Sequence, residues 1–205
     1  MTTPNNKNGK SILEQIARRV MLEHGFLPDF SLVVLDELAK IQQVNGGTAP
    51  AIKDLRHLLW ASIDNDDSLD LDQLTASETL PDNNVKIFVA IADVDALVKK
   101  NSEIDGHAHQ NTTSVYTAGK TFPMLPEKLS NGLCSLRPDE DRLAFTVFMN
   151  VSPRGSIKEY EIVESVIRSK QRFSYERVQE LIDRLEEVRA AVPSDAPFAD
   201  VLWQM

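Results

Sequence analysis

A short acidic run, residues 63–73, constrains this chain more than any other feature of its sequence. Five carboxylates fall within nine positions, and they belong to Asp64, Asp66, Asp67, Asp70 and Asp72. Like charges this close repel one another, so each prefers to be protonated, to spread into water or to share a cation. Apolar residues within and beside the run indicate that it is tethered to a core: Ile63, Leu69, Leu71 and Leu74. Because hard oxygen ligands suit Mg²⁺, Mn²⁺ or Ca²⁺ better than zinc, the run predicts a site for one of these ions.

An EF-hand is the first alternative for this run. Counted from Asp64, oxygen-bearing side chains stand at loop positions 1, 3, 5, 7 and 9, as an EF-hand requires. Position 6 is Leu69 in place of glycine, and position 12 is Thr75 in place of glutamate. The EF-hand therefore fails at its two most diagnostic positions. A solvated acidic loop, the usual state of a charge run, and a turn stabilised by Ca²⁺ stay open as alternatives.

Three of the aspartates stand in the frame I-D-x5-D-x-D: Asp64, Asp70 and Asp72. This frame resembles the catalytic aspartate signature of the ribonuclease II (RNB-domain) family of 3′→5′ exoribonucleases. Downstream segments agree with the family in order and spacing: residues 89–93, 113–116, 122–130 and 133–136. Ordered matches of this kind are much more specific than one motif alone. The resemblance covers residues 55–180.

The resemblance implies an enzyme that hydrolyses single-stranded RNA to nucleoside 5′-monophosphates and so acts in RNA degradation. Asp64, Asp70 and Asp72 would be its catalytic residues and would bind Mg²⁺, with Mn²⁺ as the alternative ion. In the family an aromatic side chain stacks on a base near the scissile 3′ end, and Tyr116 stands at that position. The segment after Phe122 would bring two serines, Ser130 and Ser135, near the site, with Ser130 as a substrate-binding residue. The implied fold is α+β, a mixed β-sheet or barrel core with packed helices.

One residue departs from the family pattern. The usual motif ends in two adjacent aspartates, D-x-D-D, whereas this chain has Gln73 after Asp72. A glutamine can offer a neutral carbonyl oxygen to substrate or metal, but it brings no charge. We interpret Gln73 as a variation that marks a D-L-D-Q subgroup, with Gln73 as a substrate-binding residue. The alternative hypothesis is that the chain is a catalytically impaired relative with an RNA-binding or regulatory role.

The overall charge argues against simple binding along RNA phosphates, because the formal net charge is −9. Either local basic patches persist, or RNA-binding modules lie beyond residue 205. We favour the second, since family members continue well past this length, and we expect a fragment with weak or no activity alone. The best basic stripe is Arg168, Lys170 and Arg172, interpreted as a solvated strand face.

The sequence predicts a cytoplasmic protein without a membrane segment. It contains no apolar run long enough to cross a bilayer, and its N-terminus lacks the apolar core of a signal peptide. Its one cysteine, Cys134, excludes an internal disulfide and fits a reducing compartment. Because Cys134 stands in an apolar segment, we expect a buried structural thiol and no nucleophile.

The spacing of apolar residues and a Gly- and Pro-containing linker at residues 45–50 divide the chain at residue 50. Residues 1–50 are expected to form a small helical hairpin and a linker. Ser11 and Glu14 predict a capping box at the first helix, and Ser31 predicts the cap of the second. Residues 51–205 would be the N-terminal part of an RNB catalytic domain.

Within that domain, alternating apolar residues predict strands at 60–63, 74–79, 85–92, 143–151 and 157–173. Helices are expected over 94–100 and over 174–190, with Tyr175 on the buried side of the second. The polar stretch 101–120 contains His107 and His109, which we expect to be exposed. Two histidines at i and i+2 do not share a helical face, so a zinc site is not expected.

Overall fold

The computed structural model describes residues 7–42 and 52–184. These residues fall into two compact units. The first contains residues 7–42 and 97–130, and the second contains residues 52–96 and 131–184. The expected linker at 45–50 lies outside the described residues. The first unit combines segments from both sides of residue 50. The division of the chain into two domains at that residue stays a prediction.

The first unit is built from helices and a short hairpin. Its elements are α1 (Lys7–Glu23), α2 (Leu32–Lys40), α3 (Glu103–Asn111), β5 (Val115–Tyr116) and β6 (Thr121–Phe122). Gly25 follows α1 with a φ of +80°, which a residue without Cβ adopts at little cost. The buried Asn111 joins α3 to the turn after α1, because its side chain exchanges two hydrogen bonds with the Leu27 backbone, of 2.8 and 2.9 Å.

Two predictions for this unit need correction. The first helix begins at Lys7, so Ser11 lies inside it and does not cap it, whereas Ser31 does cap α2 through a 3.3 Å hydrogen bond from the Val34 amide. His107 is buried in α3, with its ring 4.4 Å from that of Phe30, and only His109 is exposed as expected. The short segment Glu103–Asn111 is nearly free of large apolar residues, and this hid the helix from a search for apolar periodicity.

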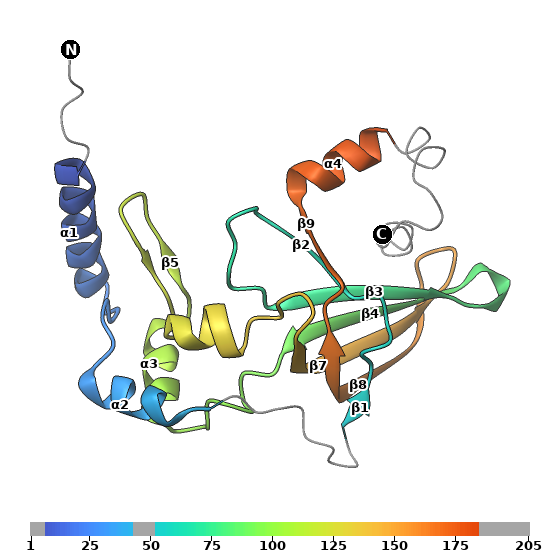
Figure 1. The fold of residues 1–205 in the computed structure, drawn as a ribbon, viewed down its shortest axis with the longest axis horizontal. Coiled ribbons are helices and arrows are strands. Elements are labelled where there is room, and N and C mark those ends of the chain that lie inside the picture. The colour runs from blue at the N-terminus through green and yellow to red at the C-terminus, as the bar shows by residue number, and fades with distance from the viewer. Residues whose placement is uncertain (1–6, 43–51, 185–205) are drawn as a thin grey trace. The chain divides into compact units, whose positions relative to one another are not determined.

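The second unit is a seven-stranded mixed sheet with the order β1-β8-β7-β4-β3-β2-β9. Four of its strands, β3, β4, β7 and β8, form an antiparallel meander, and β2 pairs in parallel with β9 (Figure 1). The strands are β1 (Lys53–Asp54), β2 (Ala61–Asp64), β3 (Gln73–Thr79), β4 (Val85–Ala92), β7 (Asp141–Val151), β8 (Ile157–Arg168) and β9 (Gln171–Ser174). A 3-10 turn (Pro81–Asn83) joins β3 to β4, and a π-helical turn (Leu129–Leu133) precedes β7. In the described chain the sheet is open, with β1 and β9 at its edges, so the barrel form of the predicted core is not seen.

The core of this unit lies around Trp60, whose side chain is fully buried. Its indole meets the Phe88 ring edge-on at 6.1 Å, and Nε1 donates a 2.8 Å hydrogen bond to the Leu55 carbonyl oxygen. An indole packed and hydrogen-bonded in this way is held firmly in place. Since Trp60 directly precedes β2, this packing fixes the strand that ends at Asp64.

Most predicted strands are confirmed, but the long strand over 157–173 is divided. The chain leaves β8 after Arg168, and the Lys170 amide donates a 2.8 Å hydrogen bond to the Trp60 carbonyl oxygen, which starts β9 beside β2. The segment 94–100 forms turns and no helix. Ser174 caps α4 (Tyr175–Asp183) as predicted, but Tyr175 is exposed. The predicted end of this helix, near residue 190, lies outside the described residues.

Candidate active site

The acidic loop, residues 65–72, joins two neighbouring strands of the sheet. β2 ends at Asp64, which stands opposite Ser174 of β9, and β3 begins at Gln73, which stands opposite Ile91 of β4. The Asp72 carbonyl oxygen accepts a 2.9 Å hydrogen bond from the Ala92 amide. The two ends of the loop are therefore fixed by sheet pairing, and Asp64, Asp72 and Gln73 stand where two strands meet the loop.

The middle of the acidic loop is held by one arginine. Arg172 of β9 donates from Nη1 to the Ser68 carbonyl oxygen at 2.8 Å and from Nη2 to the Asp66 carbonyl oxygen at 2.9 Å. The guanidinium group offers donors in a rigid fork, so it can fix two carbonyls at once. The expectation of a solvated strand face is thus wrong for Arg172, which is half-buried against the loop.

A buried serine holds the last part of the loop. Ser135 Oγ donates to the Leu69 carbonyl oxygen at 2.8 Å and accepts from the Leu71 amide at 3.3 Å. The neighbouring Leu136 amide donates to the Leu71 carbonyl oxygen at 2.7 Å. Arg142, itself buried, donates from Nε to the Ser135 carbonyl oxygen at 3.0 Å. The segment containing Ser135 therefore lies at the acidic loop, as the family resemblance implies.

A pocket of about 240 Å³, which we call the acidic pocket, opens along β2 and beside the start of β3. It is lined by polar side chains of both strands and of α4, together with small and apolar neighbours: Ala61, Ser62, Ile63, Asp64, Asp72, Gln73, Thr75 and Tyr175. The structure thus brings together Asp64, Asp72 and Gln73, three of the residues predicted from the sequence. It adds Tyr175, whose exposed phenol group was expected to be buried.

The two carboxylates of this pocket carry electrostatic strain. Asp64 Oδ2 is buried and has no hydrogen-bond partner among the described residues. The pKa of Asp72 is raised, first because the surrounding protein desolvates its carboxylate, and further because Asp70 and Asp64 place like charge near it. An unsatisfied carboxylate oxygen and a carboxylate that resists ionisation are both relieved by a bound cation.

Asp70 is less closely associated with the pocket. Its side chain is exposed and acts on Asp72 through charge, but it does not line the pocket. In the described ranges, no three aspartate, glutamate, histidine or cysteine side chains are grouped to hold one metal ion. The pair Asp64 and Asp72, with its hard oxygen donors and one unsatisfied oxygen, fits a divalent cation. The site of three aspartates stays a prediction.

Two further predicted residues belong to the first unit. Tyr116 lies in β5 with its ring exposed, and Ser130 lies half-buried in the π-helical turn. Their contacts with substrate stay predictions. Cys134 is buried, as expected, and burial raises the pKa of its thiol to about 11, so the thiol stays protonated near neutral pH.

Comparison with known families gives a match to the RNB domain over residues 52–200. This match covers well over half of the chain and contains every element of the second unit. The chain belongs to the RNB family. The family that the resemblance indicated is thereby confirmed.

RNB relatives of known sequence and structure agree with this assignment. Ribonuclease R of Chlamydia trachomatis is 39% identical over 166 residues, which are 80% of this chain and 24% of that protein. Ribonuclease R of Thermotoga maritima is 40% identical over 151 residues, 74% of this chain and 21% of that protein. A structure of Mycoplasma genitalium RNase R in complex with double-stranded RNA matches with a TM-score of 0.77 at 30% identity, covering 90% of this chain and 32% of that one. The chain spans about a quarter of the length of the curated relatives that it matches.

Sequence reasoning missed the parts of this RNB site that depend on tertiary structure. Arg172 carried a weak signal, its place in an alternating basic stripe, but strand periodicity does not say which loop the stripe faces. Tyr175 carried none, because an aromatic residue in the first turn of a helix is more often part of the core. No described helix has the length and apolar character that crossing a membrane requires.

Proposed function

We propose that this chain is part of an RNB 3′→5′ exoribonuclease that hydrolyses single-stranded RNA. The observation that carries the proposal is the meeting of Asp64 and Asp72 in one pocket, with Asp64 Oδ2 buried and unsatisfied. RNB membership supplies the reaction class, and two of the matched RNase R structures contain double-stranded RNA or ribose-methylated single-stranded RNA. In the reaction the bond between phosphorus and the upstream O3′ breaks as water adds. The products are a nucleoside 5′-monophosphate and a shortened strand with a free 3′-hydroxyl.

Four residues of the acidic loop and the adjoining strands would bind the metal ion and the substrate. Asp64 and Asp72 would bind Mg²⁺ or Mn²⁺, with Asp70 adding negative charge from the loop. Such an ion would supply Lewis-acid stabilisation of the phosphodiester and a nucleophilic water at neutral pH. Gln73 would offer its neutral amide to the substrate in the same pocket, where a third carboxylate would repel phosphate.

Residues around the pocket would position these groups. Arg172 and Ser135 hold the acidic loop by its backbone, so the carboxylates need not reorganise when substrate arrives. The exposed ring of Tyr116 suits stacking on a base, an interaction that tolerates any sequence. Ser130 would contribute a substrate hydrogen bond from the same unit as Tyr116.

A single-turnover assay with the protein in excess over RNA tests the proposal. A 3′-end-labelled single-stranded RNA is incubated with the chain and Mg²⁺ or Mn²⁺, and release of labelled mononucleotide is followed. We expect slow release by the wild type and none by Asp72→Asn, which should still bind RNA. Asp67→Asn, an exposed acid of the same loop, is the matched control and should retain activity. An active Asp72→Asn chain would remove the assignment.

One observation favours a second candidate function, binding of RNA without cleavage. Gln73 replaces an aspartate of the usual motif, and the described residues contain no group of three metal-ligating side chains. RNA that is retained intact at every metal concentration by the wild-type chain would support this candidate. Cleavage that Asp72→Asn abolishes would exclude it.

A further inference from the structure

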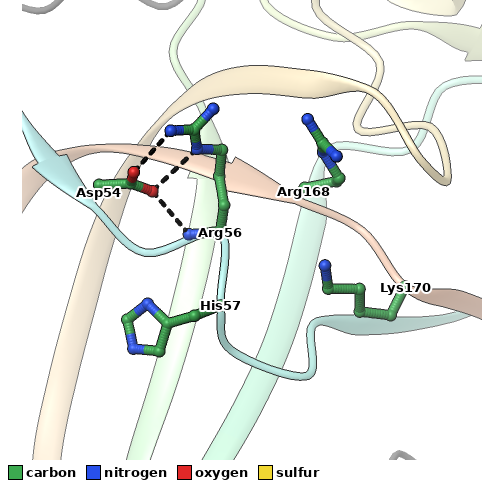
Figure 2. A pocket seen from close by; sticks show the side chains of 5 residues that line it. All are labelled: Asp54, Arg56, His57, Arg168 and Lys170. Carbon is green, nitrogen blue, oxygen red and sulfur yellow. Dashed lines mark hydrogen bonds and ion pairs between the residues drawn. The ribbon is translucent and has the colours of Figure 1, made fainter.

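A second pocket of the sheet unit gathers basic side chains away from the acidic loop. It has a volume of about 410 Å³, and we call it the cationic pocket. Its lining residues are Asp54, Arg56, His57, Arg168 and Lys170 (Figure 2). They come from β1, from the turn after it, and from the place where the chain passes from β8 to β9. The formal net charge of the chain is −9, so this local concentration of basic side chains contrasts with the acidic character of the chain as a whole.

One side of the cationic pocket is already neutralised. Arg56 donates from Nε and Nη2 to the Asp54 carboxylate at 2.9 and 2.6 Å, and from Nη1 to Asp141 at 2.9 Å. Figure 2 shows Arg56 and Asp54 facing each other across these bonds. All three guanidinium nitrogens of Arg56 are therefore used within the protein, and this arginine ties β1 to β7. Its role is structural.

On the other side of the cationic pocket, several N–H donors make no hydrogen bond to any described residue. Arg168 uses Nε on Asp141 at 2.6 Å, but neither of its Nη atoms has a partner in the described chain. The Lys170 ammonium group likewise makes no hydrogen bond or ion pair to any described residue, although its backbone amide is fixed to Trp60. Asp139 adds a further negative charge near Arg168 without a hydrogen bond. Guanidinium and ammonium groups with unused N–H donors suit a ligand that carries several anionic oxygen acceptors.

The position of these donors relates them to the candidate active site. Lys170 lies beside Trp60, just before β2 and β9 begin to pair, whereas Asp64 and Ser174 are paired at the other end of the same two strands. Four residues of strand separate Lys170 from Ser174, or about 13 Å at the usual rise per residue. This is the scale of a few nucleotides of an extended single strand. The acidic pocket is lined by β2 from Ala61 to Asp64, and Lys170 of the cationic pocket directly precedes Gln171, the residue that pairs with Ala61.

We propose that Lys170 and Arg168 of the cationic pocket bind a backbone phosphate of single-stranded RNA, upstream of a 3′ end at the acidic pocket. The proposal rests on the proposed function for the direction of the strand. The three residues of the basic stripe would then have two different roles. Arg172 holds the acidic loop, whereas Arg168 and Lys170 face a ligand.

Lys170→Gln is the informative variant, since its ammonium group has no partner among residues 7–42 and 52–184 and its loss should leave the melting temperature unchanged. Lys158→Gln is the matched control. It removes the same charge from an exposed position of the same strand as Arg168, ten residues or about 33 Å along β8. Binding of a 5′-fluorescein-labelled single-stranded RNA is measured by anisotropy in EDTA, between 50 mM and 200 mM salt.

For Lys170→Gln we expect the slope of log K against log salt to fall in magnitude by about 0.7, the value for one contact with a single strand. Because this contribution vanishes near 1 M salt, the loss of affinity should be about eightfold at 50 mM and about threefold at 200 mM. Lys170→Arg should restore binding, and Lys158→Gln should leave the slope unchanged. Equal effects of Lys170→Gln and Lys158→Gln would overturn the proposal, as would a wild-type chain that does not bind RNA.

A second measurement separates RNA from a free phosphate as the source of the anion. Inorganic phosphate is titrated into ¹⁵N-labelled wild type and Lys170→Gln, and amide shifts around residues 168–171 are followed. Shifts caused by phosphate in the wild type alone, together with unchanged RNA binding by Lys170→Gln, would assign the pocket to free phosphate and overturn the RNA proposal. Because the anisotropy assay contains EDTA, a failure to hydrolyse RNA would contradict the proposed function without affecting this test.

Discussion

Arg172 donates a 2.8 Å hydrogen bond to the backbone carbonyl oxygen of Ser68, in the middle of the acidic loop. The bond crosses from β9 to the loop between β2 and β3, and a second one, to the Asp66 carbonyl oxygen at 2.9 Å, lies beside it. Both acceptors are main-chain atoms, so these two bonds hold the backbone of the loop and not its carboxylates. The backbone that carries the aspartates is thereby fixed.

Replacing Arg172 with glutamine should therefore weaken both the fold and the binding of a metal ion. Glutamine cannot reach both carbonyl oxygens, so the loop gains freedom that a bound ion must remove. We expect the free energy of unfolding to fall by about 1 kcal/mol and the affinity for Mg²⁺ to fall several-fold. Urea unfolding and calorimetric Mg²⁺ titration measure the two effects. Arg154→Gln, which alters the turn between β7 and β8, should change neither, and an unaltered Mg²⁺ affinity in Arg172→Gln would contradict this role.

Ser135→Ala tests the other support of the acidic loop. The change leaves the Leu69 carbonyl oxygen and the Leu71 amide without the hydroxyl that now bonds both. Because Ser135 is almost fully buried, water cannot easily replace the hydroxyl, and we expect a loss of about 1–3 kcal/mol in the free energy of unfolding. Ser156→Ala, at an exposed turn, is the control and should stay within about 0.5 kcal/mol of the wild type. A Ser135→Ala protein as stable as that control would show that the loop does not depend on the hydroxyl.

The strands of the sheet could be predicted because they alternate, but the contacts of the site could not. Residues 85–92 give a strand from composition and turn signals alone, and the strand is found with those bounds. The contact of Arg172 with residues 66 and 68 joins positions more than a hundred residues apart, which no local pattern encodes. Asp64 and Asp72 were found because their spacing matches a family motif, and their meeting in one pocket is a result of the β2–β3 pairing.

Two errors in the prediction share one physical cause. His107 was expected to be exposed because its surroundings in the sequence are polar, yet Phe30 and Asn111 bury it. Tyr175 was expected on the buried side of its helix, yet it is exposed and lines the acidic pocket. In both cases tertiary packing, which the local sequence does not report, decided the environment of the side chain.

Mg²⁺ should stabilise the wild-type chain and not the Asp72→Asn variant. Without metal, Asp72 is desolvated and repelled by Asp70 and Asp64, so its negative charge costs stability. Removing that charge should raise the melting temperature in EDTA while abolishing the rise that saturating Mg²⁺ gives the wild type. At a concentration 100 times its Kd, a ligand of the folded state adds about 2.7 kcal/mol. Differential scanning calorimetry in EDTA, Mg²⁺ and Ca²⁺ measures these shifts.

The same experiment separates an Mg²⁺ site from a turn stabilised by Ca²⁺. A larger stabilisation by Ca²⁺ than by Mg²⁺ would favour the turn, because Ca²⁺ accepts irregular oxygen cages that Mg²⁺ does not. Asp67→Asn, at an exposed position of the same loop, serves as the control and should keep the Mg²⁺ response. An Asp72→Asn protein that Mg²⁺ still stabilises as fully as the wild type would exclude this residue as a ligand.

His107 should make the stability of the first unit depend on pH. Burial lowers the pKa of its imidazole, because the charged form would lose its hydration. The unfolded chain keeps the ordinary pKa near 6.5, so below that pH the unfolded state takes up a proton that the folded state resists. The contribution to stability is therefore full above about pH 6.5 and falls as the pH drops toward the lowered pKa of the folded state. Protonation would also remove the acceptor at Nε2, which now lies 3.2 Å from the Asn111 side-chain amide.

His107→Gln removes this titration, whatever its effect on stability at neutral pH. The free energy of unfolding in urea is measured from pH 7.5 to pH 5, and the difference in pH dependence between wild type and variant isolates His107 from the carboxylates that titrate below. We expect the wild type to lose more stability over this range than His107→Gln does. His109→Gln, on the exposed side of α3, is the matched control and should follow the wild type, since an exposed ring keeps its hydration when the chain folds. Parallel curves for His107→Gln and the wild type would show that protonated His107 is accommodated in the fold without cost.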